Sequence, residues 1–201
     1  MTNNPLDSLT SDEADDSAFA KFRKLNQYVA ITVALLATFK GICKVKDDNI
    51  VQAMQQAQAN RLDHWNFYQA RNIREEIAKG TLLQLQLAAP SQPASERQNY
   101  QKAIDQYTQL AADQANKKNE LKLQAEQDQK DYDAANFRDD QFDLADALLA
   151  IAISLLAVTA LTHLWWLYFV SLVPTGFGVL MGLAGLAGWG IHPDALIRLL
   201  S

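Results

Sequence analysis

The feature that most constrains this chain is a long interval without charge. Between Asp146 and Asp194 lie 47 consecutive residues that include no Asp, Glu, Lys or Arg. A helix of a water-soluble domain needs a polar face, so such domains interleave charged and apolar residues. A helix of roughly 20 apolar residues crosses the hydrocarbon core of a bilayer. The interval therefore predicts two membrane-spanning helices.

The first of these predicted spans covers residues 142–161 and the second covers 164–190. Trp166 and Trp189 are separated by about 35 Å of helical rise, which suits tryptophans in the two headgroup belts. A single helix that ends before Pro174 is the competing division of the interval. It would leave too few residues for a second crossing, so we prefer the two-span division.

A third apolar stretch lies near the amino terminus. Leu25–Phe39 contains no charged residue, and the apolar run continues past Lys40 to Cys43. We expect a membrane helix over residues 21–43, acting as an uncleaved anchor, after a disordered acidic tail over residues 1–20. A buried helix of a soluble domain is the alternative interpretation.

The middle of the chain, residues 44–141, is polar, and 17 of the 18 glutamines lie between Gln52 and Gln141. Prolines and small residues mark one turn, at residues 89–95, with arms of similar length on either side. This pattern predicts a water-exposed antiparallel helical hairpin. The expected fold is thus all-α: an integral membrane protein with three transmembrane helices, a long coiled-coil-like hairpin, and an interfacial tail over residues 191–201.

The second arm carries a heptad pattern, with alternating spacings of four and three residues from Tyr100 to Phe142. Several polar residues occupy this seam and weaken it: Gln114, Lys118, Asp128 and Asp139. The seam expected in the first arm is less regular and includes Ile73 and Ile77. The residues predicted to pack within the hairpin or between copies are Trp65, Tyr68, Tyr100, Ile104, Tyr107, Leu121 and Tyr132.

Large apolar side chains are sparse in this seam, so one hairpin alone would have little core. We therefore expect copies of the chain to associate as a homo-oligomer. Small residues in the last span would allow helices to approach closely in lipid. The residues predicted to make this contact are Gly178, Gly182, Ala184 and Gly188.

Carboxylates gather where the second arm meets the predicted membrane surface. In an oligomer, Asp139, Asp143 and Asp146 would form a ring around the axis. Such a ring is typical of the mouth of a cation channel. The alternative is that these carboxylates simply stay in water at the interface.

Composition excludes several other functions. The net charge of −5 argues against a nucleic-acid partner, and the single cysteine excludes an intrachain disulfide and multi-cysteine zinc sites. The sequence contains no phosphate-binding, metalloprotease, serine-hydrolase or dinucleotide motif. We therefore expect no catalytic, cofactor-binding or metal-binding residues and no small-molecule substrate, and we expect the lipid bilayer and further copies as partners.

Two segments resemble an uncharacterised bacterial membrane-protein family, a domain of unknown function: DHWNFYQARNIREEI from Asp63 and FDLADALLAIAISLLAVTALT from Phe142. The resemblance covers roughly residues 20–190. It implies one amino-terminal membrane helix, a helical middle rich in Ala, Gln and Glu, and a carboxy-terminal membrane hairpin. It also implies a bacterial inner (plasma) membrane location, with the thylakoid membrane as the alternative, and an amino terminus in the cytosol.

The function expected from these observations is that of a membrane-anchored, homo-oligomeric structural or scaffolding protein without catalytic activity. The alternative is an oligomeric cation-conducting pore with the aspartate ring at its mouth.

Overall fold

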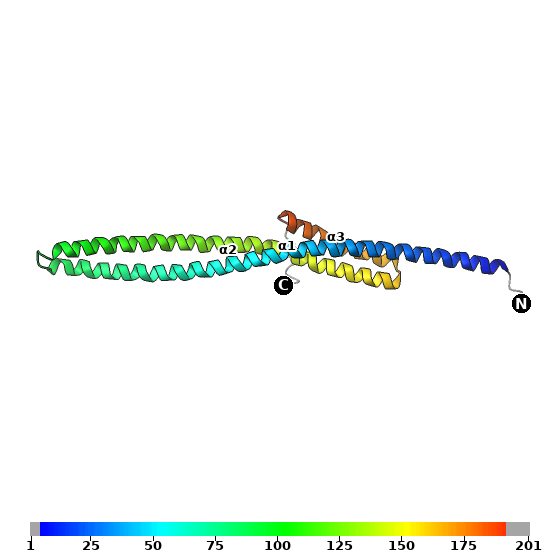
Figure 1. The fold of residues 1–201 in the computed structure, drawn as a ribbon, viewed down its shortest axis with the longest axis horizontal. Coiled ribbons are helices and arrows are strands. Elements are labelled where there is room, and N and C mark those ends of the chain that lie inside the picture. Colours follow the sequence, from blue (N-terminus) through cyan, green and yellow to red (C-terminus); the bar gives the residue numbers. More distant parts are fainter. Residues whose placement is uncertain (1–4, 192–201) are drawn as a thin grey trace. The chain divides into compact units, whose positions relative to one another are not determined.

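The computed structural model describes the backbone of residues 5–191 and the side chains of residues 21–191. Throughout the described backbone the regular structure is helical (Figure 1). The elements in chain order are α1 (Pro5–Ala88), the short 3-10 helix η1 (Ala89–Ser91), α2 (Arg97–Thr162) and α3 (Trp165–Ala187).

Prolines and residues in the left-handed region account for the helix ends. Pro5 occupies the first position of α1, where its missing N–H would lack an intrahelical partner in any case. Pro90 and Pro93 flank the turn between α1 and α2, and neither supplies the N–H that a continuing helix needs. His163 has a φ of 55°, which ends α2 and turns the chain into α3.

The long helices pass without a break from the apolar segments into the polar arms. α1 continues through the predicted tail, span and first arm as one helix of 84 residues. Its helical backbone begins at Pro5, whereas a disordered tail is expected from the sequence over residues 1–20. Once a helix is nucleated, each further residue adds a hydrogen bond at little cost, so the stable segment extends into its flank. The predicted interfacial tail lies beyond residue 191, outside the described residues.

The chain divides into two compact units. The three-helix unit comprises residues 1–51 and 136–201, and the hairpin unit comprises residues 52–135. α1 and α2 each contribute to both units, whereas α3 belongs only to the three-helix unit.

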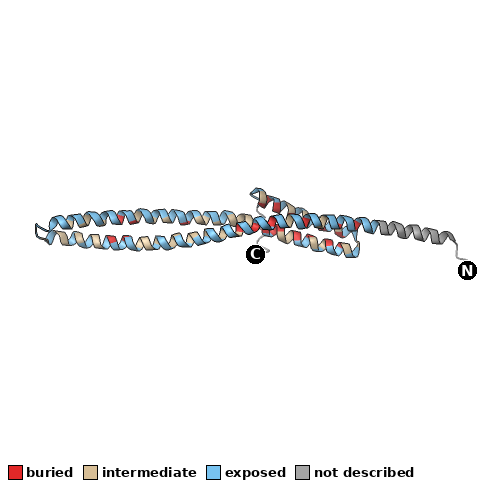
Figure 2. Cartoon of the chain, viewed as in Figure 1, coloured by how far each residue is buried: buried red, intermediate tan, exposed pale blue. Residues whose placement is uncertain are grey.

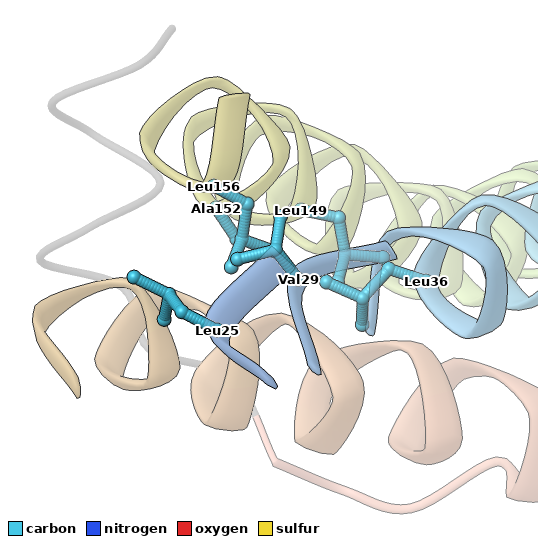
Figure 3. Packing of buried hydrophobic residues seen from close by; sticks show 6 residues of the cluster. All are labelled: Leu25, Val29, Leu36, Leu149, Ala152 and Leu156. Carbon is cyan, nitrogen blue, oxygen red and sulfur yellow. The ribbon is translucent and has the colours of Figure 1, made fainter. Parts of the chain in front are cut away.

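The core of the three-helix unit is made of aliphatic side chains. Figure 3 shows its main cluster, in which three residues of α1 meet three residues of α2. Burying a leucine fully contributes about 1.5–3 kcal/mol, so this cluster accounts for much of the packing of α1 on α2. Its members are Leu25, Val29, Leu36, Leu149, Ala152 and Leu156. A second cluster joins α2 to α3 and contains Leu144, Ala145, Met181 and Ala184.

The outer faces of the same unit are also apolar. Ile31 of α1 is 61% exposed, Leu161 of α2 is 83% exposed and Phe177 of α3 is 56% exposed. By length and composition, each of the three helices contains a segment able to span a membrane. In water, these faces would leave large apolar areas in contact with solvent, which is unfavourable. Surrounding lipid would remove that contact.

The hairpin unit has a much poorer core, and Figure 2 shows few buried positions along it. Its buried apolar residues are Ala78, Ala111 and Ala125, and its other buried residues are the polar Glu75 and Gln114. Alanine has little side-chain area to bury, so hydrophobic burial between the arms is modest.

Candidate functional site

In the three-helix unit, charged residues lie together where α1 and α2 leave their apolar segments. Lys40 of α1 and Asp146 of α2 form an ion pair with 2.7 Å between Nζ and Oδ1. One turn further along α1, Lys44 Nζ donates to Asp47 Oδ2 at 2.8 Å and lies 3.2 Å from Asp48 Oδ1. These carboxylates raise the pKa of Lys44 above its ordinary value, mainly through the hydrogen bond to Asp47. The group is called the junction cluster below.

Asp47 is the buried member of the junction cluster, with 4% of its surface exposed. The second oxygen of its carboxylate, Oδ1, has no hydrogen-bond partner among the described side chains and backbone. Asp139 of α2 lies within hydrogen-bonding range of Asp47 if one of the two carboxyls carries a proton. Burial raises the pKa of Asp139 to about 7, aided by this hydrogen bond and by the negative charges of Asp143, Asp47 and Asp140.

A small cavity of about 10 Å³ adjoins this cluster. That volume is about the minimum that holds one water molecule. Among the residues whose side chains are described, no group of three or more His, Cys, Asp and Glu is arranged to hold a metal ion. The residues that line the cavity are Lys40, Cys43, Lys44, Asp47, Phe142, Asp146 and Leu149.

The three residues predicted for a pore ring have different environments. Asp143 is exposed, Asp146 pairs with Lys40, and Asp139 is half-buried near Asp47. The structure therefore gives two of the three carboxylates partners within the same chain, and the ring remains a prediction.

The carboxy-terminal end of α3 is held by polar side chains of α2 that the sequence patterns did not single out. Arg138 Nη2 donates to the carbonyl oxygen of Gly185 at 3.0 Å. Gln141, which is fully buried, donates through Nε2 to the carbonyl oxygens of Trp189 at 2.8 Å and Ile191 at 2.6 Å. The last carbonyls of a helix have no intrahelical partners, and Arg138 satisfies one of them, that of Gly185, whereas Gln141 binds the backbone just beyond the end of α3. In the sequence, Arg138 and Gln141 are a polar pair three residues apart just before a predicted span, and this spacing was the signal for their shared role.

The small residues of α3 have separate roles. Gly178 and Gly182 are buried, and a Cβ atom at Gly182 would lie 2.7 Å from the Phe39 ring of α1. Gly185, which was not predicted, lies against Phe142 of α2, where a Cβ atom would approach the ring to 2.8 Å. Ala184 is fully buried in the contact with α2.

Gly188 differs from its predicted role in helix packing. It is exposed, and a Cβ atom there would meet nothing within 4 Å. Its φ of 68° places it in the left-handed region, where it caps the end of α3. The spacing of four from Ala184 thus reflects a helix terminus rather than a packing stripe.

In the hairpin unit, polar residues of the α2 seam find polar partners on α1. Lys118 Nζ lies 2.6 Å from Glu75 Oε2, and Arg71 Nη1 donates to Gln114 Oε1 at 3.0 Å. His64 Nδ1 lies 2.6 Å from Asp128 Oδ2. Hydrogen bonds from Lys118 and Lys79 lower the pKa of Glu75. These pairs compensate for the polarity that weakens the seam and define one register of the arms.

The predicted packing residues of this unit are half-buried between the arms: Trp65, Tyr68, Tyr100, Ile104, Tyr107, Leu121 and Tyr132. Trp65 and Tyr68 contact each other edge to face along α1, with ring centroids 5.2 Å apart. Ile73 and Ile77, expected in the inner seam, are instead 59% and 63% exposed. The inner positions of α1 are occupied by Arg71, Glu75 and Ala78, since charged pairing with α2 decides which face turns inward.

The outward face of the hairpin arm of α1 consequently carries exposed aliphatic residues, interspersed with polar ones such as Gln69, Glu76 and Gln84. Its exposed aliphatic residues fall within about a third of the helix circumference at 100° per residue. A hollow of about 240 Å³ adjoins one of them, Ile77, and its other lining residues are Arg74, Ala78, Tyr107, Leu110 and Gln114. The members of this outer apolar face are Leu62, Ile73, Ile77, Leu83 and Leu87.

A family model described as "Domain of unknown function (DUF4337)" matches residues 25–188. Comparison with curated proteins finds no match, and comparison with solved structures finds none. The matched region includes the whole hairpin unit, residues 25–51 and 136–188 of the three-helix unit, the junction cluster and the outer apolar face. Because the family model matches most of the sequence, the chain belongs to the DUF4337 family, a domain of unknown function.

Proposed function

We propose that the chain is a membrane-anchored, homo-oligomeric structural or scaffolding protein without catalytic activity. The three-helix unit is the anchor, and the hairpin unit is the water-exposed part through which copies associate. The membrane is the inner (plasma) membrane of a bacterium, with the thylakoid membrane as the alternative.

The observation that carries this proposal is the outer apolar face of the hairpin unit. Outward positions of a helix in water are ordinarily polar, because they gain nothing from burial. Here Leu62, Ile73, Ile77, Leu83 and Leu87 are between 54% and 71% exposed in the isolated chain. An exposed apolar patch of this kind marks a surface that another molecule covers.

A second copy of the chain is the occupant that fits this face best. Copies anchored in one bilayer present the same face at the same height above the membrane, so the two faces meet by diffusion within the plane of the membrane. A self-complementary patch is also what a two-fold interface requires. The hollow beside Ile77 supplies a recess for a side chain of the neighbouring copy.

The weak core of the hairpin unit supports the same conclusion. Its buried apolar residues are alanines, so the arms gain little from hydrophobic burial against each other. Burying one Leu or Ile fully contributes about 1.5–3 kcal/mol, which several alanine contacts do not match. Association of hairpins adds the larger side chains of the outer apolar face to a shared core.

The proposal of a membrane anchor rests on the apolar outer faces of α1, α2 and α3. If this unit were in water, large side chains such as Leu161 and Phe177 would be in contact with solvent. The alternative, a cation-conducting pore, stays a prediction, although Asp146 pairs with Lys40 within one chain.

Light scattering on the full chain in a mild detergent tests the proposal. After subtraction of the detergent mass, we expect a protein mass that is a whole multiple of 22.4 kDa and at least twice that value. A monodisperse monomer at all protein concentrations would contradict it.

A further inference from the structure

The junction cluster contains a buried carboxylate oxygen that nothing in the proposed scaffold uses. Asp47 is 4% exposed, and its Oδ2 accepts the hydrogen bond from Lys44. Its Oδ1 is buried and has no hydrogen-bond partner in the described part of the chain. A buried acceptor without a donor costs about 1–3 kcal/mol, so a donor is expected to occupy this position.

The charged surroundings of Asp47 and Asp139 are mostly negative. α3 brings no charge to the cluster, because Trp165–Ala187 contains no ionisable acid or base other than Tyr168. The basic groups near the site are Lys40, which pairs with Asp146, Lys44, which pairs with Asp47 and Asp48, and Arg138, which donates to the end of α3. The acidic groups near it are Asp47, Asp48, Asp139, Asp140, Asp143 and Asp146, and the Cys43 thiol lines the adjoining cavity.

Every basic group of the cluster is thus engaged with something other than Asp139. Two ionised carboxylates within hydrogen-bonding range repel each other strongly in a partly buried site, and one of them then keeps its proton. The adjoining cavity of about 10 Å³ has room for about one water molecule, which would connect the pair to the aqueous phase.

We propose that Asp47 and Asp139 form a proton-binding site that holds a single proton between α1 and α2. The carboxyl O–H of one residue donates to a carboxylate oxygen of the other, and the proton comes from water at the membrane surface. The shared proton supplies the donor that Asp47 Oδ1 lacks. Loss of the proton leaves two adjacent carboxylates on α1 and α2, which then repel each other.

This site makes the contact of the two long helices sensitive to pH in the neutral range. Burial raises the pKa of Asp139 to about 7, which agrees with loss of the shared proton in this pH range. The proposal is independent of the scaffold function, because it concerns residues of the three-helix unit and requires no second copy.

Infrared difference spectroscopy on the full chain in detergent or lipid tests the proposal. As the pH falls from about 9 to about 5, we expect a protonated-carboxyl C=O band to appear with a midpoint near 7. The band should shift in heavy water, as an exchangeable O–H requires. A wild-type spectrum without any carboxyl band titrating in the neutral range would overturn the proposal, whatever the variants do.

Variants assign the band. Asp139→Asn and Asp47→Asn should each abolish the neutral band, whereas Asp131→Asn, which changes an exposed carboxylate of α2, should retain it. A neutral band that persists in Asp139→Asn would assign the proton to another residue and refute the site. If one Asn variant fails to give a helical circular dichroism spectrum, the other decides.

The titration is then repeated with sodium replaced by choline. The midpoint should not change, because the site takes a proton. A midpoint that depends on sodium would show that a metal cation occupies the pair, which contradicts the proposal.

Discussion

Replacing the two central isoleucines of the outer apolar face should dissociate the oligomer. In the isolated chain Ile73 is 59% exposed and Ile77 is 63% exposed. Full burial of an isoleucine contributes about 1.5–3 kcal/mol, so association can recover about 1–2 kcal/mol from each of these side chains. Two side chains on each of two copies then contribute about 4–8 kcal/mol. Glutamine keeps the helix propensity of the arm but removes this contribution.

The double variant Ile73→Gln/Ile77→Gln should therefore weaken association at least about 1000-fold, taking the lower bound of about 4 kcal/mol. Light scattering over a concentration series in mild detergent measures the change as a fall in protein mass toward the monomer. Its matched control is Ile73→Leu/Ile77→Leu, which keeps the face apolar and should keep the oligomer. An unchanged mass for the glutamine variant, with an intact helical spectrum, would refute the assignment of this face.

Three further outcomes follow from the contacts within one chain. Lys118→Met removes a partner of the buried Glu75 carboxylate and should lower the Tm of the hairpin by several degrees in circular dichroism melts. The two lysine partners lower the pKa of folded Glu75, so their pairing with Glu75 stabilises the fold at pH values above about 4.3, the pKa of an unfolded glutamate. The stabilisation is lost as the pH falls through the lower pKa of folded Glu75. Gly182→Ala should destabilise the packing of α3 by about 1–3 kcal/mol through overpacking, whereas Gly176→Ala, with open space around it, should not. The wild-type chain should lose stability as the pH rises from about 4 to about 7, because its raised pKa lets folded Asp139 keep a proton that the unfolded chain releases. Asp139→Asn should remove that loss and be more stable than wild type above pH 7 in denaturant titrations, by about 1–2 kcal/mol at this half-buried, solvent-screened position.

The helical architecture was predictable because it depends on features that a sequence displays directly. The interval without charge between Asp146 and Asp194 indicates helices in an apolar environment, and the prolines at 90 and 93 indicate a turn. The continuity of α1 from Pro5 to Ala88 was less accessible, since a change of composition looks like a boundary although a helix propagates across it.

The inner face of the first arm could not be found from apolar spacing, because polar pairs define it. Arg71 and Glu75 occupy inward positions where they meet Gln114 and Lys118 of the other arm. A search for apolar periodicity instead selects Ile73, which lies outside. Complementary polar residues on two facing seams are visible only when both arms are aligned against each other.

The junction cluster was only half predictable for a similar reason. The carboxylates near Asp143 are adjacent in the sequence and so were recognised together. Asp47 is nearly 100 residues away along the chain, and only the packing of α1 on α2 brings it to Asp139. Burial of one carboxylate beside another is a property of tertiary structure, which local sequence patterns do not contain.

We propose that the apolar segments of α1, α2 and α3 lie in hydrocarbon, and a spin label on α3 gives the most direct test of this placement. Phe177 is 56% exposed near the middle of α3, so a cysteine there points away from the protein core. In a Cys43→Ser background reconstituted in lipid vesicles, a nitroxide at position 177 should be relaxed more strongly by oxygen, which concentrates in hydrocarbon, than by a water-soluble nickel chelate. Stronger relaxation by the nickel chelate would place this helix in water and contradict a membrane location for the three-helix unit.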